Sequence, residues 1–469
     1  MSESPHVEEL KSPLAPTEVL ARFRHWPGAV LFHSAAERPE LGRFSFFAAD
    51  PLERWQWRLS DLIGAAPATS PTTRLFQPLR NSLQTLGNHP IPDVPPFQGG
   101  LAGVIGYELG GLWEHLPSAG PEQTPAVSIG LYDWVISWDH LHRRAWLIVQ
   151  PASGHRKQST TERAAAIHHV LQTPPPATAP FTTPPAPRAT ATDPFQRIPG
   201  LISNFDRPAY EQAVARIVRY IHAGDIFQAN LSQRFTAPAV LPPVDLYRRL
   251  AQVNPAPFAG YYDGGSFQVI SASPERFLRL SGDDVETRPI KGTRPRRTGV
   301  EADLLTRDEL RESDKDRAEN VMIVDLLRND LSRVCRPASI RVPQLCAVET
   351  YETVQHLVSV VRGALKPGHD FFDLLAATFP GGSITGAPKI RAMEIITQLE
   401  QVPRGPYCGT LFYLGANGEA DSSILIRTFT HTAGQLHFPA GGGITAQSDP
   451  AAEYDETLHK VEGLLRALE

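Results

Sequence analysis

The sequence predicts an α+β fold, on three observations. Short strand-like runs fill the first third of the chain, at residues 29–32, 100–107, 127–138 and 144–149. A helical pattern follows residue 200, where apolar side chains recur at Ala213, Ile217 and Ile221, and strands resume at 267–271. A hairpin signal lies in the last quarter. Helices and strands mixed in this way, with local hairpins and no repeat of about 20–50 residues, are typical of an α+β architecture.

The hairpin is the clearest single element. Residues 410–414 form a β-rich run, and Asn417-Gly418 supplies a turn pair that tolerates positive φ. The returning strand is expected over 421–432.

Three helices are expected in the second half of the chain. Ser313 is a suitable N-cap for a helix over 313–331, because its side chain can accept from a free N–H of the first turn. Apolar spacing predicts a helix over 390–399, directly after Pro388, which suits a first helical turn. The third is expected over 450–468.

Proline marks a boundary in the chain. The sequence has 44 prolines in 469 residues, roughly twice the usual share of about 5%, and many of them gather in 173–194. Such a stretch buries little surface and predicts an exposed, semi-extended linker. The expected organisation is an N-terminal region over 1–172, the linker over 173–194 and a C-terminal region over 195–469.

Composition excludes several classes of protein. With 45 Lys and Arg against 50 Asp and Glu, the formal charge is −5, which gives no bulk attraction to nucleic acid or an anionic membrane. The three cysteines have neither a disulfide-framework pattern nor CxxC metal spacing. The N-terminus lacks signal-peptide features, and no apolar run approaches the ~20 residues of a membrane span. The expected location is the cytoplasm, with no nucleic-acid or membrane partner.

Two glycine-rich stretches and one arginine point to anion binding. Residues 379–389 lead into an expected helix whose N-terminus favours anions, although a structural tight turn fits as well. Residues 440–445 could present backbone N–H groups. Arg427 falls between Leu425 and Phe429 on one face of the expected strand, where an unpaired guanidinium is costly. Its partner is either a ligand anion or an internal carboxylate.

Three carboxylates could form a divalent-cation site. Glu319 lies on the same helical side as Ile323, where a carboxylate is unusual unless it is paired or bound to a metal. Glu453, Glu456 and Lys460 share one face of the last helix, and a solvated charged face is the alternative. Mg²⁺ needs only one or two such carboxylates plus substrate oxygens. Their spacing does not establish that they meet in space.

Lys291 and His356 are further candidates. Arg288 and Arg294 flank Lys291, and neighbouring positive charge can depress the pKa of a lysine and make it nucleophilic. A solvated loop is the alternative. His356 is expected on a strand face with Val358, where an ordinary core histidine is the alternative.

Taken together, these motifs resemble the chorismate-utilising enzymes, the family of anthranilate synthase component I. The resemblance is detailed after about residue 200 and looser before it. It implies a two-layered α/β body with large, mostly antiparallel sheets and helices on the outside, and it makes 195–469 the chorismate-binding catalytic region. The segments that carry it are 225–232, 273–277, 289–293, 316–320, 379–389 and 441–445 with the helix that bears Glu453 and Glu456.

The resemblance implies a catalytic set. Lys291 would attack C2 of the chorismate ring, Glu275 would act as general acid and base, and His356 would assist from beside the ring. Anthranilate synthase large subunits carry alanine at the position of Lys291. The lysine therefore implies the branch of the family that converts chorismate and ammonia to 4-amino-4-deoxychorismate, on the route to 4-aminobenzoate and folate.

The resemblance also implies ligands. Mg²⁺ would bind the ring carboxylate, held by Glu319 and Glu456 with Glu453 nearby. The substrate-binding residues would be Thr293, Tyr407, Arg427, Gly441, Gly443 and Lys460. A separate set resembles the family's tryptophan pocket, so that L-tryptophan could be bound there, and ordinary core packing is the alternative. That set comprises Ser34, Arg43, Phe44, Pro257 and Phe258.

Other functions stay open on the sequence alone. Formation of anthranilate is the nearest alternative, and formation of isochorismate or salicylate would use water in place of ammonia. A non-catalytic chorismate-binding regulatory subunit is the alternative of a different class. No cysteine sits in a nucleophile turn like that of a glutamine amidotransferase. Ammonia is therefore expected from glutamine through a separate amidotransferase subunit, or in its free form.

Overall fold

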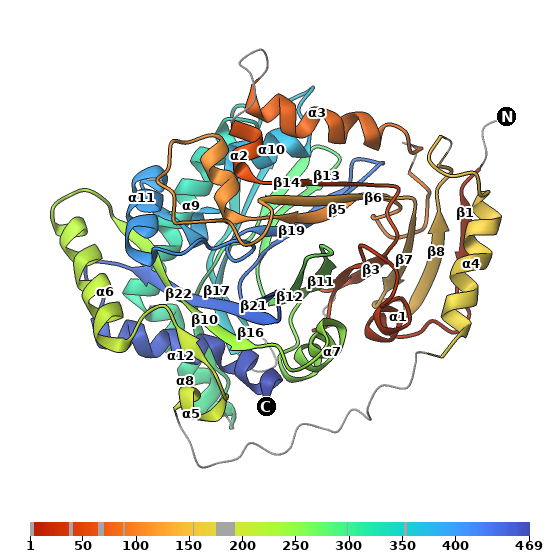
Figure 1. Cartoon of the computed structure of the whole chain (residues 1–469). Coiled ribbons are helices and arrows are strands. Elements are labelled where there is room, and N and C mark those ends of the chain that lie inside the picture. Colours follow the sequence, from red (N-terminus) through yellow and green to blue (C-terminus); the bar gives the residue numbers. More distant parts are fainter. Residues whose placement is uncertain are drawn as a thin grey trace.

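The structure is a computed structural model, and it describes residues 4–36, 41–63, 70–87, 90–152, 154–174, 193–297, 299–350 and 354–469. Most of the linker predicted over 173–194 lies outside the described residues. Two large antiparallel sheets face each other, and helices cover their outer sides (Figure 1). The predicted α+β fold class is confirmed.

The first sheet has twelve strands, and every pairing between them in the described part of the chain is antiparallel. Along the sheet they are β1 (His6–Glu9), β8 (Arg144–Val149), β7 (Trp134–Asp139), β3 (Phe44–Ala48), β2 (Val30–His33), β11 (Phe258–Asp263), β12 (Phe267–Ser273), β21 (Thr428–Thr432), β22 (Gln435–Ile444), β10 (Gln228–Pro238) and β18 (Gly386–Ala387), with β9 (Ile202–Ser203) paired to β10.

The second sheet has ten strands. They are β15 (Ile290–Pro295), β17 (Val354–Ala364), β14 (Asp284–Thr287), β13 (Arg276–Ser281), β20 (Ala420–Ile424), β19 (Thr410–Gly415), β5 (Gly100–Ile105), β6 (Val127–Tyr132) and β4 (Glu53–Trp57), with β16 (Arg341–Thr350) paired to β17. Each sheet thus combines strands from 1–172 with strands from 195–469, so the two regions fold together.

Helices pack on the outside of both sheets. They are α1 (Pro16–Arg22), α2 (Leu59–Ile63), α3 (Pro71–Leu83), α4 (Thr160–Gln172), α5 (Pro194–Arg197), α6 (Arg207–His222), α7 (Pro243–Val253), α8 (Val300–Glu312), α9 (Asp314–Ser332), α10 (Phe371–Thr378), α11 (Lys389–Glu400) and α12 (Pro450–Leu468), with 3₁₀ turns η1 (Tyr107–Leu112) and η2 (Gly382–Ile384). The three predicted helices are confirmed, and Ser313 caps α9 by accepting from the N–H of Asp316 at 3.3 Å.

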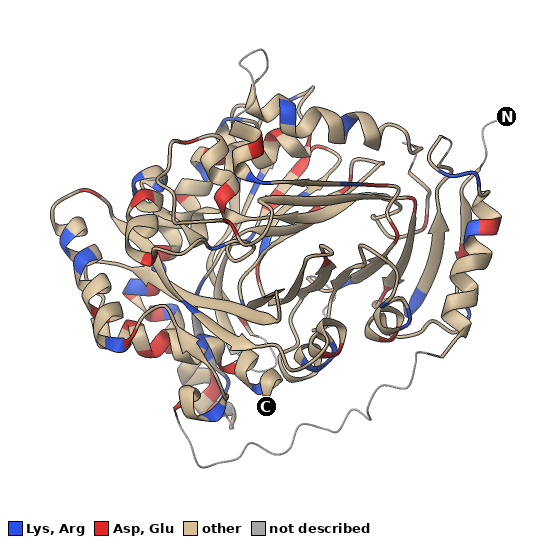
Figure 2. Cartoon of the chain, in the orientation of Figure 1, with Lys and Arg blue, Asp and Glu red and all other residues tan. Residues whose placement is uncertain are grey.

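Apolar side chains from the two sheets form the layer between them. Phe46 and Tyr262 from the first sheet pack with Val104 and Leu411 from the second, and all four are buried. Charged residues of both signs are interspersed over the outer helices (Figure 2). None of the helices in the described part of the chain is long and apolar enough to cross a membrane.

The predicted hairpin is only half right. Strands β19 and β20 pair as expected, with Thr410 opposite Ile424. The returning strand ends there instead of running to residue 432, because the chain crosses to the other sheet and begins β21 at Thr428. Arg427 takes φ 50° in this crossing, so it is not a strand residue.

The run predicted over 127–138 is divided in the same way. Strand β6 belongs to the second sheet and β7 to the first, with Asp133 between them. Alternation of side chains has a period of two in any strand, and it carries no signal for a change of sheet.

Candidate active site

Lys291 lies beside a β-bulge of β15. It stands opposite Leu357 of β17, and Thr293 stands opposite the buried His356, so Gly292 is an extra residue in the pairing. Gly292 has φ 76°, and a Cβ there would lie 2.9 Å from Cγ of Asp316 on α9. Glycine therefore permits both the bulge and the close approach of α9. Bulges commonly re-aim side chains near active sites.

Ser383 connects Lys291 to Glu275. Nζ of Lys291 donates to the backbone oxygen of Ser383 at 3.0 Å, and Oγ of Ser383 donates to Oε1 of Glu275 at 2.6 Å. Ser383 belongs to η2, inside the glycine-rich stretch 379–389. No sequence pattern identified Ser383, because its partners lie far away along the chain.

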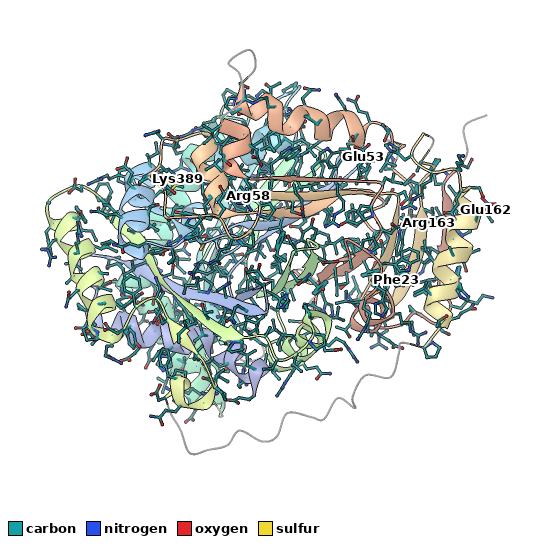
Figure 3. The ribbon with its side chains drawn as sticks, in the orientation of Figure 1. Phe23, Glu53, Arg58, Glu162, Arg163 and Lys389 are labelled. Atoms are coloured by element: carbon teal, nitrogen blue, oxygen red, sulfur yellow. The ribbon has the colours of Figure 1, made fainter. Side chains whose placement is uncertain are left out.

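Lys389 at the end of this stretch is already paired. Its Nζ donates to Oδ2 of Asp330 at 2.6 Å and to the backbone oxygen of Thr378 at 2.9 Å. It lies at the start of α11 (Figure 3). The stretch is therefore better described as a structural turn, which positions Ser383, than as an anion site.

Burial sets the protonation of both catalytic candidates. It raises the pKa of Glu275 to about 7, partly opposed by the Ser383 hydroxyl and by Lys291. It also lowers the pKa of Lys291, although Glu319 acts in the opposite direction. Near neutral pH, Glu275 can therefore exchange a proton, and Lys291 is neutral more often than an exposed lysine.

The cause predicted for the lysine pKa is wrong. Arg288 is paired with Glu349 at 2.5 Å, and Arg294 is paired with Asp316 at 3.0 Å. Neither arginine is among the groups that shift the pKa of Lys291, whereas burial is the largest cause.

Replacing Glu275 with glutamine is expected to change how stability depends on pH. A buried carboxyl with a raised pKa stabilises the fold when protonated, and this contribution is lost as pH rises from about 4.5 to about 7. Glutamine does not titrate. The melting temperature of Glu275→Gln relative to the wild type should therefore be higher at pH 8 than at pH 5. A difference that is the same at both pH values would show that Glu275 is not buried as a titrating acid.

The three predicted metal ligands converge on two adjacent glycines of β22. A Cβ at Gly442 would lie 3.2 Å from Oε2 of Glu453 and 3.4 Å from Oε1 of Glu456. A Cβ at Gly443 would lie 3.2 Å from Oε2 of Glu319. The missing side chains let these carboxylates approach the strand backbone closely, and carboxylate oxygens are the ligands that a hard cation such as Mg²⁺ takes. The residues present therefore fit the cation.

Lysines balance these carboxylates. Lys315 donates to Oε1 of Glu453 at 3.0 Å, and Lys460 lies 2.6 Å from Oε1 of Glu456. Burial acts to raise the pKa of Glu456, but Lys460 and the other nearby lysines outweigh it, so this pKa is lowered. The pKa of Glu319 is raised, because burial is its largest cause. Within the described ranges, no group of three or more acidic, His or Cys side chains is preformed for a metal. The sequence offered no signal for Lys315.

Gly441 and Gly443 present backbone N–H groups to an open edge. Gly441 stands opposite Ser232 of β10, and Gly443 stands opposite Asn230. The N–H groups of Ser232 and Asn230 donate to Glu400 and Thr385, and so they point away from β22. These are therefore non-hydrogen-bonded pairs, in which the glycine N–H and C=O groups also point away from β10. On that side β21 pairs only with the start of β22, and Lys460 donates to the oxygen of Gly441 at 2.8 Å.

Tyr407 and Arg427 lie on neighbouring segments. The N–H of Cys408 donates to the oxygen of Leu425 at 2.8 Å, and Arg404 lies 5.8 Å from the ring centroid of the buried Tyr407. Burial lowers the pKa of Arg427. No carboxylate partner of Arg427 is found in the described part of the chain, so the structure gives no support to an internal ion pair.

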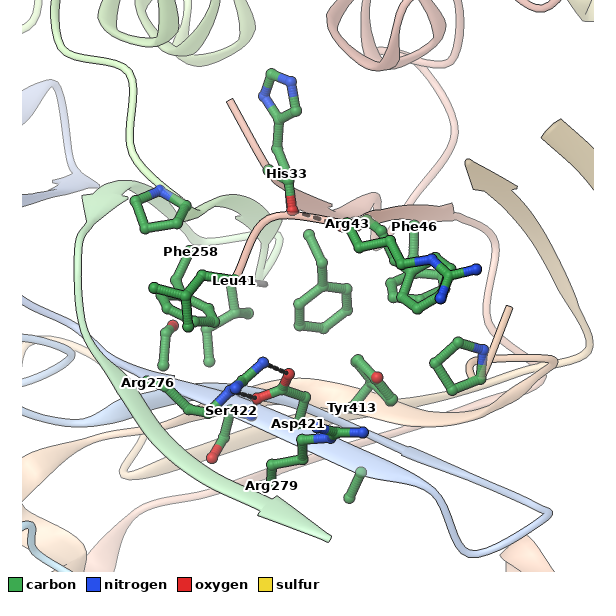
Figure 4. A pocket seen from close by; sticks show the side chains of 18 of the residues that line it. His33, Leu41, Arg43, Phe46, Phe258, Arg276, Arg279, Tyr413, Asp421 and Ser422 are labelled. Atoms are coloured by element: carbon green, nitrogen blue, oxygen red, sulfur yellow. Dashed lines mark hydrogen bonds and ion pairs between the residues drawn. The ribbon is translucent and has the colours of Figure 1, made fainter. Parts of the chain in front are cut away.

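The five residues of the predicted tryptophan site line one pocket of about 280 Å³ (Figure 4). Aromatic residues from both sheets, including Phe46 and Tyr413, form its walls. Arg276 makes hydrogen bonds of 3.0 and 2.9 Å to Asp421 and lies 5.0 Å from the ring centroid of Phe258. A cavity that combines aromatic walls with polar and charged side chains suits a small ligand that has both kinds of group. The five residues are Ser34, Arg43, Phe44, Pro257 and Phe258.

Comparison with known proteins agrees with this geometry. The profile of the chorismate binding enzymes matches residues 46–466. The chain belongs to the chorismate-binding enzyme family. Aminodeoxychorismate synthase component 1 of Salmonella typhimurium is 40% identical over 463 residues, which cover 97% of this chain and 96% of the relative.

Anthranilate synthases are close relatives as well. Component 1 of Streptomyces coelicolor is 42% identical over 384 residues, covering 81% of this chain and 74% of that protein. The crystal structure of anthranilate synthase component I from Streptococcus pneumoniae superposes with a TM-score of 0.75 at 30% identity, covering 92% of this chain and 93% of that one. The chain is thus a chorismate-utilising enzyme, and overall similarity does not separate the two activities.

Proposed function

We propose that this enzyme converts chorismate and ammonia to 4-amino-4-deoxychorismate, as an aminodeoxychorismate synthase component I. The observation that carries the proposal is Lys291. Its side chain is linked to Glu275 through a single residue, because Ser383 is hydrogen-bonded to both. A buried lysine with a lowered pKa next to a carboxyl group that titrates near neutrality is suited to nucleophilic catalysis.

The first step forms a bond to the enzyme. Nζ of Lys291 attacks C2 of the ring, both ring double bonds shift, from C1=C2 to C1=C6 and from C5=C6 to C4=C5, and the C4–O bond breaks. Glu275 in its protonated form gives its proton to the departing hydroxyl, which leaves as water. Its pKa of about 7 keeps a protonated fraction available at neutral pH.

The second step releases the enzyme. Ammonia attacks C4, both ring double bonds shift back to C5=C6 and C1=C2, and the bond between C2 and Nζ of Lys291 breaks. Glu275, now a carboxylate, takes a proton from the incoming amine. The net change is replacement of hydroxide by an amino group, with water as the other product. His356, buried beside Thr293 in the strand pairing, would assist the orientation of the ring.

Substrate binding would use charges and backbone donors. Tyr407, Arg427 and the N–H groups of Gly441 and Gly443 would hold a carboxylate of chorismate, and Lys460 would add positive charge. Glu319 and Glu456 would hold Mg²⁺ with Glu453 nearby. When bound, Mg²⁺ would neutralise negative charge on the ring carboxylate and fix its orientation.

Chorismate consumption at high ammonium concentration tests the proposal. We expect purified enzyme with Mg²⁺ to form 4-amino-4-deoxychorismate, which keeps its pyruvyl group and gives 4-aminobenzoate only after a separate lyase is added. Fluorescent anthranilate with pyruvate would instead support the second candidate, anthranilate synthase, since the chain is also 42% identical to the Streptomyces enzyme. A failure to consume chorismate would favour the regulatory subunit.

The ammonia would come from a partner. The names of the relatives as component 1 support a second subunit, which we propose to be a glutamine amidotransferase. Addition of such a subunit should make glutamine as effective as ammonium.

The pocket between the sheets is proposed to hold L-tryptophan. Protein purified without added tryptophan and then denatured is expected to release close to one equivalent, measured by chromatography. Added tryptophan should raise the melting temperature of protein from which it has been removed, because a ligand of the native state stabilises it. If there is neither release nor a thermal shift, ordinary packing around Phe44 and Phe258 is the correct description.

A further inference from the structure

Gln228 is a polar side chain that the proposed mechanism does not use. It begins β10 and is fully buried, yet neither its Nε2 nor its Oε1 has a hydrogen-bond partner in the described part of the protein. Buried amides are rarely left unpaired, because the loss of hydration is not compensated. An unpaired carboxamide at this depth indicates a group that pairs with something absent from the protein itself.

The carboxamide lies in the active site. A Cβ at Gly443 would be 2.0 Å from Nε2 of Gln228 and 3.2 Å from Oε2 of Glu319. The amide thus fills the space over Gly443 that any other residue would need, next to a predicted metal ligand. Gly443 also turns its backbone N–H away from β10, toward the open edge of β22.

The partner of Gln228 should be an anion. A neutral amide can donate a hydrogen bond close to Glu319 without adding a negative charge that would repel the substrate. Chorismate is a dianion, and a hydrogen bond from an amide to a carboxylate is stronger than one between neutral groups. An amide here therefore suits a carboxylate ligand better than a third acidic side chain would.

We infer that Gln228 is a substrate-binding residue whose Nε2 donates to a carboxylate oxygen of bound chorismate. The inference rests on the proposed binding of chorismate at Gly443 and adds a side-chain donor to it. It also assigns a role to the glycine, since a Cβ at Gly443 would displace the amide.

Gln228→Met tests the inference, because methionine keeps the length of the side chain and removes both polar atoms. The KM for chorismate should rise roughly 10- to 100-fold, the usual effect of losing a hydrogen bond to a charged group. The melting temperature without ligand should stay the same or rise, because an unpaired buried amide has been removed. Chorismate should also raise the melting temperature of the variant less than that of the wild type.

Gln233 provides a matched control on the same strand. It is equally buried, but its Nε2 donates to Oγ1 of Thr457 at 2.5 Å and its Oε1 accepts from Ser203 at 2.7 Å. Gln233→Met should therefore lower the melting temperature and leave KM unchanged. Gln228→Asn shortens the side chain by one methylene and so withdraws the amide from the ligand. It should weaken binding as Gln228→Met does, and it serves as the test if the methionine variant does not fold.

The outcomes separate the inference from the proposed function. If chorismate neither stabilises nor reacts with the wild type, the proposed function fails. If the wild type binds chorismate and Gln228→Met has the same KM and thermal shift, the role of Gln228 is overturned. A lowered melting temperature with unchanged KM would likewise overturn it, because the amide would then pair with buried water.

Discussion

Replacing Lys291 with alanine is expected to abolish covalent attachment of chorismate and to lower turnover by about three orders of magnitude or more. Incubation of the wild type with chorismate and Mg²⁺, without ammonia, should add the mass of chorismate less one water. Tryptic mapping should locate that mass on Lys291, since its amine is the buried nucleophile beside Glu275. Intact-mass spectrometry and ammonium-dependent turnover are the two measurements.

Two variants separate attack by the lysine from its charge. Lys291→Arg keeps a positive charge near Glu319 but offers no nucleophile, so it should also fail to form the adduct. Lys157, which is exposed, is the control, and its replacement by alanine should leave adduct and turnover unchanged. An adduct that maps elsewhere, or full turnover by Lys291→Ala, would exclude the two-step mechanism and favour direct addition of ammonia.

Removal of a carboxylate beside β22 is expected to have the next largest effect. Glu319→Gln and Glu456→Gln should each lower Mg²⁺-dependent turnover at least about 100-fold, because each removes one charged oxygen ligand. In the wild type, added Mg²⁺ should raise the melting temperature, and this shift should shrink in both variants.

Glu462 provides the control for the last helix. It lies on α12 like Glu456, but it pairs with Arg197 at 2.9 Å. Glu462→Gln should retain the response to Mg²⁺ and nearly full turnover. If Glu319→Gln and Glu456→Gln keep the wild-type response to Mg²⁺, the carboxylates serve only as partners of Lys315, Lys460 and Lys291, and the metal assignment fails.

Local signals were sufficient for the helices. The predicted span 450–468 coincides with α12, because Asp449 caps it and Pro450 starts it. The helix after Ser313 was equally well defined by its cap. Caps and apolar spacing act within a few residues, so the sequence displays them directly. Several strands were found for the same reason, through short β-rich runs of residues.

The sequence also determined most of the candidate site. Glycines at 441–443 and the acidic residues of α9 and α12 are recognisable from residue type and spacing. The structure brings Glu319, Glu453 and Glu456 to Gly442 and Gly443, a meeting that their spacing could not establish. Which residue types are available is thus a property of the sequence, and which of them meet is a property of the fold.

Only the tertiary structure decided the sheet memberships and the contacts between distant residues. The chain changes sheet after Ile424 and at Asp133, within stretches that each read as one strand-like run in the sequence. Ser383 reaches Lys291 and Glu275 from 92 and 108 positions away, and Gln228 reaches Gly443 from a different strand. Local patterns record how a segment buries its own apolar face, whereas these contacts depend on how segments far apart in the sequence pack together.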